Sequence, residues 1–160
     1  HALILSGGFV SKAPMYVMRG AMPLKTLTYY MPAGWLPLGV KIGGHFMIPS
    51  VPFKEAYFLE DALKFRKALN LPLVYVGGLI SRKKIDEVLD YGFEFVSMAR
   101  ALINDPAFVN HMKEDKHARC DCGHSNYCIG RMYSIEMACH KHVQNLPEKL
   151  IKEIEQLENK

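Results

Sequence analysis

The sequence of 160 residues contains no apolar run long enough to cross a membrane. A membrane-spanning helix needs about 18–20 consecutive, mostly apolar residues. The sequence also lacks a strong excess of one charge, because its formal net charge is only +4. Its densest basic run, Arg82-Lys83-Lys84, fits a solvated helix start better than a stripe that binds nucleic acid. We therefore expect neither a membrane nor a nucleic acid as a partner.

The first residues lack the features of a secretory signal peptide. The sequence opens at His1 directly into Ala2-Leu3-Ile4-Leu5, with no initiator Met, no basic segment and no cleavage site. A sequence that starts inside a strand is typical of a fragment or of a processed piece. We therefore expect this chain to be part of a longer protein.

Cysteine is absent before Cys120, and all four cysteines fall between Cys120 and Cys139. The disulfide framework of a secreted domain is usually spread over the whole domain, so this clustering favours a cytoplasmic protein with a thiol or metal cluster. Reduced thiols that pack the tail of the chain are the simplest interpretation. Zinc is an alternative, because it accepts mixed sulfur and imidazole ligands. Its ligands would be Cys120 or Cys122, Cys128, Cys139, and His124 or His140.

The composition, 49% hydrophobic and 22% charged, is typical of a soluble globular protein. Three short apolar runs end in small residues, as expected for strands buried on both faces of a parallel sheet. We expect these strands at Leu3–Ser6, Leu73–Gly77 and Phe95–Met98, parallel and adjacent in that order. A helix between the last two would have Ser81 as N-cap and would end at Gly92. Together they form a compact βαβ unit.

Apolar periodicity and end signals predict three further helices. One runs from about Pro52 to Leu69, one starts at Asp105-Pro106, and an amphipathic helix within 143–160 starts at Pro147. Residues 9–51 are different, because prolines and glycines interrupt a largely apolar segment. We expect a long ordered loop there, which either folds over a cofactor or packs locally as a structural insertion.

Two of the expected strands are followed by residues that are suited to bind an anion. Gly77-Gly78 follows one strand, and Ala99-Arg100 follows the next. Small residues at these ends let backbone N–H groups approach an anion, and an arginine can hold phosphate oxygens with its guanidinium fork. TIM barrels commonly build a phosphate site from the loops after strands seven and eight. The alternative is that the glycines only make tight turns and that Arg100 is a surface charge.

Residues 73–78, 92–103 and 105–106 together resemble the last two barrel strands of the old yellow enzyme family, also called the NADH:flavin oxidoreductase or NADH oxidase family. That family usually has Gly-Arg where this sequence has Ala99-Arg100. Residues 5–9 resemble the end of the family's sixth strand, and residues 122–129 resemble a cysteine-containing tail of many bacterial members.

The resemblance implies an α/β fold in the form of a partial TIM (β/α)8 barrel. Residues 1–142 would supply its last three βα units, with residues 120–142 as a Cys/His tail and 143–160 as a C-terminal helix. Some family members hold a [4Fe–4S] cluster in this tail. Ser125 occupies the position of the middle cysteine here, so we expect no cluster and name no metal ligand. The missing N-terminal part of the barrel, or a second copy, is the expected partner.

The implied activity is that of an FMN-dependent oxidoreductase. NADH or NADPH reduces the flavin, which passes a hydride to an activated alkene as in ene-reductases. The FMN phosphate would bind Gly77, Gly78, Ala99 and Arg100, and the flavin ring would lie towards Gly7 and Gly8. The family's catalytic residues lie on the first five strands, so none is assigned; packing explains Tyr29, Tyr30 and His45 as simply. The alternative function is a non-catalytic module that binds phosphate or a metal.

Overall fold

The computed structural model describes residues 1–7, 14–134 and 136–159. The chain divides into two compact units. The first comprises His1–Gly8 and Phe53–Cys122, and the second comprises Phe9–Pro52 and Gly123–Lys160.

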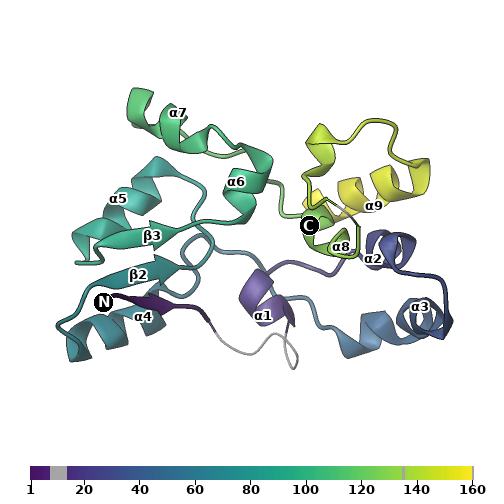
Figure 1. Cartoon of the computed structure of the whole chain (residues 1–160), viewed down its shortest axis with the longest axis horizontal. Helices are drawn as coiled ribbons and strands as arrows, with labels where there is room; N and C mark the ends of the chain where they lie inside the picture. The colour runs from purple at the N-terminus through teal and green to yellow at the C-terminus, as the bar shows by residue number, and fades with distance from the viewer. Residues whose placement is uncertain (8–13, 135, 160) are drawn as a thin grey trace. The chain divides into compact units, whose positions relative to one another are not determined.

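The first unit is a small α/β unit with a three-stranded parallel sheet (Figure 1). The strands follow one another in the order β1-β2-β3, and Leu3 pairs with Leu73 while Val76 pairs with Ser97. This confirms the predicted order and direction of the three strands. The elements of the unit are β1 (Leu3–Leu5), α4 (Leu59–Ala68), β2 (Leu73–Val76), α5 (Arg82–Asp90), β3 (Phe95–Ser97), α6 (Arg100–Asn104) and α7 (Phe108–Glu114).

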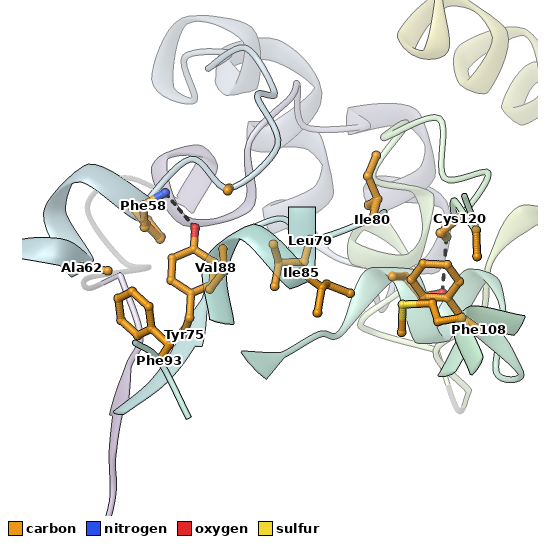
Figure 2. Close-up of a cluster of buried hydrophobic side chains, with 14 of the residues drawn as sticks. Phe58, Ala62, Tyr75, Leu79, Ile80, Ile85, Val88, Phe93, Phe108 and Cys120 are labelled. Atoms are coloured by element: carbon orange, nitrogen blue, oxygen red, sulfur yellow. Dashed lines mark hydrogen bonds between the residues drawn. The ribbon is translucent and has the colours of Figure 1, made fainter. Parts of the chain in front are cut away.

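The hydrophobic core of this unit surrounds the central strand β2. Leu73 and Tyr75 are fully buried, and side chains from α4, α5 and α7 complete the cluster shown in Figure 2. The two outer strands are different, because Ile4 is 59% exposed and Phe95 is 57% exposed. The prediction that every strand is buried on both faces is therefore wrong for β1 and β3. In the part of the chain that the structure describes, β1 and β3 are the edge strands of the sheet, with β2 as their neighbour.

Helix α5 follows its local signals closely. The Ser81 hydroxyl oxygen accepts the N–H of Lys84 at 3.3 Å, and Gly92 follows the helix with a φ of 92°. The next predicted helix is confirmed with a later start. Asp105 accepts the N–H of Ala107 at 3.0 Å, and α7 begins at Phe108.

The helix predicted from Pro52 is wrong in its first part, because α4 begins only at Leu59. Two tertiary interactions account for the difference. Ala56 has a φ of 55° and donates its N–H to the carbonyl oxygen of Gly78 at 3.2 Å. The carboxylate of Glu55 accepts the N–H of Ile80 at 3.0 Å. These bonds hold residues 53–58 in a folded loop instead of a helix.

The second unit is helical in the residues that the structure describes. The expectation of one long loop over 9–51 is wrong for residues 14–51, which contain three helices. Pro14 is the first residue of α1, Pro23 precedes α2, and Pro37 lies in the first turn of α3. A proline at such a position removes an N–H that has no partner within the helix, so it starts a helix instead of breaking one. The helices are α1 (Pro14–Met18), α2 (Leu24–Tyr30), α3 (Trp35–Met47), α8 (Tyr127–Gly130), the 3-10 helix η1 (His140–His142) and α9 (Glu148–Glu158).

Segments distant in sequence are joined within the second unit. The side-chain amide of Asn126 donates to the carbonyl oxygens of Arg19 at 2.7 Å and Ala21 at 3.0 Å. The hydroxyl groups of Tyr30 and Tyr127 share a hydrogen bond of 2.7 Å. The predicted C-terminal helix is confirmed as α9, which begins directly after Pro147.

Over the parts of the chain that the structure describes, no helix combines the length and the apolar character required to span a membrane.

Candidate functional site

The predicted anion site begins at the glycine pair that follows β2. Gly77 has a φ of 153° and Gly78 a φ of 68°, conformations that favour glycine. A Cβ atom on Gly78 would lie 2.4 Å from Cε1 of Tyr57, and one on Gly77 would lie 2.7 Å from the hydroxyl of Tyr75. Both positions therefore require glycine for the backbone and for packing, independently of any ligand.

Three aromatic residues of the loop before α4 surround the carboxyl end of the sheet. Phe53 and Tyr57 pack against Gly78, and Phe58 packs against Gly7 and Gly77. The rings of Tyr57 and Phe58 meet edge to face, with centroids 4.7 Å apart. The sequence analysis missed these residues as part of the site because it assigned the whole segment to a helix. Their close spacing beside Pro52 was the available signal.

Arg100 is brought to the same aromatic group by the start of α6. Its guanidinium carbon lies 5.9 Å from the centroid of the Phe53 ring, a distance suited to a cation–π contact. A Cε atom of that ring lies 2.9 Å from the position that a Cβ on Gly78 would take. Gly78 and Arg100 thus both lie against the Phe53 side chain, although they are 22 positions apart in the sequence. The exposed Ala99 has a φ of −112°, which does not require glycine.

In the glycine pair, the backbone carbonyl oxygens accept hydrogen bonds from the protein. The Tyr75 hydroxyl donates to the carbonyl oxygen of Gly77 at 3.0 Å. The N–H of Ala56 donates to the carbonyl oxygen of Gly78 at 3.2 Å. Among the residues that the structure describes, no acceptor takes the N–H of Gly77 or Gly78. Gly77 is nevertheless buried. Gly78 is half-buried, and the assignment of an anion to these two N–H groups stays a prediction.

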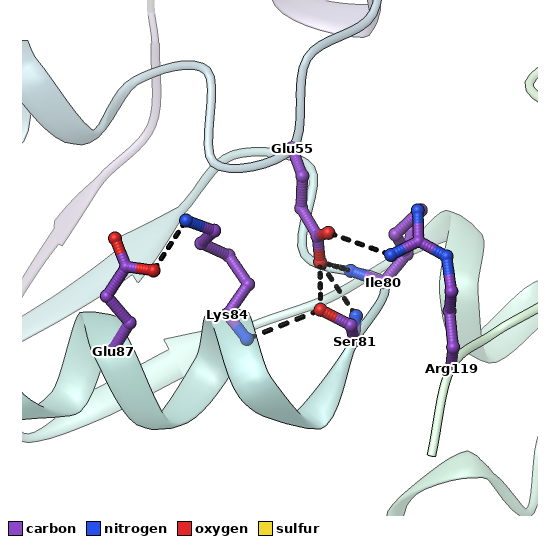
Figure 3. A network of polar contacts seen from close by, with 6 residues as sticks. All are labelled: Glu55, Ile80, Ser81, Lys84, Glu87 and Arg119. Carbon is purple, nitrogen blue, oxygen red and sulfur yellow. Dashed lines mark hydrogen bonds and ion pairs between the residues drawn. The ribbon is translucent and has the colours of Figure 1, made fainter. Parts of the chain in front are cut away.

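A polar network fixes the aromatic loop to the start of α5 (Figure 3). One carboxylate oxygen of Glu55 accepts the N–H of Ile80 at 3.0 Å and both the N–H and the hydroxyl of Ser81 at 2.8 Å. The other carboxylate oxygen accepts a hydrogen bond from the guanidinium of Arg119 at 3.2 Å. Glu55 thereby holds the loop that carries Phe53 and Tyr57 against the glycine pair.

The other predicted site residues are only partly described. Gly7 lies against the Phe58 ring, since a Cβ there would come within 2.0 Å of the ring. Gly8 lies outside the described residues, so its assignment to the flavin site stays a prediction. Tyr30 is engaged with Tyr127, and Tyr29 is 47% exposed on α2.

The cysteines are divided between the units, with Cys120 and Cys122 in the first and Cys128 and Cys139 in the second. The Cys120 thiol donates to the side-chain oxygen of Asn104 at 3.0 Å. Burial, with a smaller effect of neighbouring Cys122, raises the pKa of Cys120 to about 12. In the described part of the chain, no three His, Cys, Asp or Glu side chains are grouped so that they would hold a metal ion.

Comparison with known proteins identifies one similar enzyme. The chain is 38% identical over 133 residues to the 4,4'-dithiodibutanoate disulfide reductase of Rhodococcus erythropolis. The match covers 83% of this chain and 33% of that protein, so the chain spans about a third of the relative's length. No family model matches the chain. No solved structure matches it either.

Proposed function

We propose that this chain is the C-terminal, FMN-phosphate-binding part of a flavin-dependent NAD(P)H oxidoreductase of the old yellow enzyme type. One observation carries the proposal: Gly78 and Arg100 both contact the ring of Phe53. The two residues follow neighbouring strands of a parallel sheet. The similarity to a reductase supports an oxidoreductase in general. The sequence pattern of both strands supports the flavin.

The proposed phosphate site uses backbone and guanidinium donors. The N–H groups of Gly77, Gly78 and Ala99 would donate to phosphate oxygens, and Arg100 would add charge-assisted bonds. Among the described residues, no acceptor takes the N–H of buried Gly77 or of half-buried Gly78, which supports this assignment. The flavin, when bound, supplies hydride transfer between NAD(P)H and a substrate. Its ring would lie towards Gly7 and Gly8.

The rest of the barrel would come from elsewhere in a longer protein or from another chain. The described residues form a sheet of three strands, whereas a TIM barrel has eight. Exposed Ile4 and Phe95 on the outer strands are the side chains that neighbouring strands would cover. We accordingly propose that the isolated chain self-associates or pairs with the complementary part of the barrel.

Two substrate classes follow from separate observations. The resemblance to old yellow enzymes favours an activated alkene, which would accept a hydride at its β-carbon. The name of the similar Rhodococcus enzyme, a disulfide reductase, favours an organic disulfide, which would be reduced to two thiols. Oxidation of NAD(P)H in the presence of each substrate class distinguishes them.

The test of the phosphate site is flavin titration of the intact protein with Arg100→Ala. Loss of a charge-assisted contact costs about 1.5–3 kcal/mol, so the affinity for FMN should fall by roughly ten- to a hundredfold. Riboflavin, which lacks the phosphate, should bind equally to the variant and the parent protein. Lys67→Ala, at an exposed position of α4, is the matched control and should leave FMN affinity unchanged. Unchanged FMN affinity in Arg100→Ala would disprove the phosphate assignment.

A further inference from the structure

The second unit contains a cavity that neither the sequence pattern nor the proposed flavin site accounts for. It has a volume of about 480 Å³ and is lined by Leu24, Lys25, Thr28, Tyr29, Lys41 and Lys149. These residues come from three helices, α2, α3 and α9. The volume falls within the range of small-molecule sites, roughly 300–1,000 Å³, and exceeds what a single inorganic ion fills.

The lining carries three positive charges and no carboxylate. Lys25, Lys41 and Lys149 each come from a different helix. Within the described parts of the chain, none of these three ammonium groups forms an ion pair. Three like charges at one cavity repel one another, and an anionic ligand would offset that repulsion.

Two acidic residues of α9 form contacts of their own but do not line the cavity. The Glu153 carboxylate accepts the N–H of Lys25 and the N–H of Thr26, both at 2.7 Å. Glu148 pairs with Lys152 at 2.5 Å. Neither carboxylate lines the cavity. The partners of Glu153 are neutral, so it keeps its negative charge beside Lys25, and the cavity lining with its three lysines retains an excess of positive charge.

The cavity also has an apolar side. Leu24 and Tyr29 contribute carbon surface, and the ammonium of Lys149 lies 4.6 Å from the centroid of the Tyr29 ring. This cation–π contact holds Lys149 at the wall of the cavity. Lysine ammonium groups are compact point charges that bind phosphate oxygens without demanding one fixed geometry. The combination suits an organic molecule with a charged end.

We propose that this cavity binds an organic phosphate through Lys25, Lys41 and Lys149, with the organic part against Leu24 and Tyr29. The cavity belongs to the second unit, whereas the residues proposed for FMN belong to the first. Binding at the two places can therefore be separated by mutation.

The test is calorimetric titration of the full chain with inorganic pyrophosphate, ADP and ribose 5-phosphate as probes, and adenosine as the uncharged control. Lys41→Gln and Lys149→Gln should each weaken pyrophosphate binding by about two- to fivefold, as expected for exposed charge pairs. The double variant should weaken it by about tenfold or more, and added salt should weaken it further. Tighter binding of ADP identifies a nucleotide, and tighter binding of ribose 5-phosphate identifies a sugar phosphate.

The controls separate this site from other cationic surfaces. Lys152→Gln removes an exposed lysine of the same helix outside the cavity and should leave binding unchanged. Arg100→Ala should also leave it unchanged, so failure of the flavin site and failure of this site give different results. The proposal is overturned if pyrophosphate shows no saturable binding, if adenosine binds as tightly as ADP, or if Lys152→Gln weakens binding as much as Lys41→Gln.

Discussion

The carboxylate of Glu153 accepts both the backbone N–H of Thr26 at 2.7 Å and its hydroxyl at 2.8 Å, although the two residues are 127 positions apart in sequence. Thr26 is fully buried, and Pro23 before α2 provides no side-chain cap. A residue of α9 therefore caps α2 from across the unit. A carboxylate is well suited to this position, because the first N–H groups of a helix lack partners within it.

Replacing Glu153 with Ala should destabilise the chain. The substitution leaves buried donors of Thr26 without an acceptor, which typically costs about 1–3 kcal/mol. Glu155→Ala, at an exposed position of the same helix, is the control and should cost much less. Urea unfolding of both variants measures the difference. Equal midpoints for Glu153→Ala and the parent chain would show that the cap contributes nothing to stability.

Gly78→Val should impair folding before it affects any ligand. The residue has a φ of 68°, and a Cβ would lie 2.4 Å from the Tyr57 ring. A strained backbone of this kind costs about 1–3 kcal/mol for a residue other than glycine, before the steric clash is added. Thermal unfolding followed by circular dichroism should show a clear fall in Tm without added ligand. The double variant with Tyr57→Ala removes the clash with Tyr57 but keeps the contact with Phe53, so it should recover part of the loss, which a purely backbone effect would not allow.

The stability of the chain should fall as the pH rises above the ordinary pKa of histidine. The contact with Cys139 raises the pKa of His140 above its usual 6.5 against the effect of burial, and Glu158 raises it further while Lys141 lowers it. A raised pKa means that the fold favours the protonated form. The stabilisation that protonated His140 contributes is complete below pH 6.5. It is lost as the pH rises through the higher pKa of His140 in the folded state.

The measurement is Tm between about pH 6 and about pH 8, where histidine titrates. His140→Gln should flatten this part of the profile, whereas His117→Gln, at an exposed position, should leave its slope unchanged. A parent Tm that rises over the same interval, with the rise abolished in His140→Gln, would give the opposite sign and contradict the assignment.

Cys120 should resist alkylation in the folded chain. Its pKa of about 12, against an ordinary 9.0, reduces the thiolate fraction at neutral pH by roughly a thousandfold. Because the thiolate is the reactive form, iodoacetamide should leave Cys120 unmodified while the protein is folded. Mass spectrometry of the digested protein locates the label, and urea-unfolded protein should react at all four cysteines. Rapid labelling of Cys120 in folded protein would contradict its burial.

Local signals in the sequence were sufficient to predict the parallel sheet and the glycine turn that follows β2. Apolar runs closed by small residues predicted three parallel strands in the observed order, and Ser81 and Gly92 marked both ends of α5. These features depend on neighbouring residues, such as a hydroxyl within reach of an N–H three positions later. The sequence alone also drew attention to Gly77-Gly78 and Arg100, because strand ends in one βα unit are adjacent whatever surrounds them.

Tertiary contacts decided the features that local patterns left open or misassigned. The apolar spacing of residues 52–69 suits a helix, yet the bonds of Ala56 and Glu55 to the β2–α5 loop hold its first part as a folded loop. That loop brings Phe53 beside both Gly78 and Arg100. Glu153 likewise caps α2 from a segment more than 100 residues away in sequence. Lys149 lines the same cavity as Lys25 and Lys41, which also lie more than 100 residues before it. Periodicity carries no information on such pairs, because their free energy depends on which surfaces meet once the chain has folded.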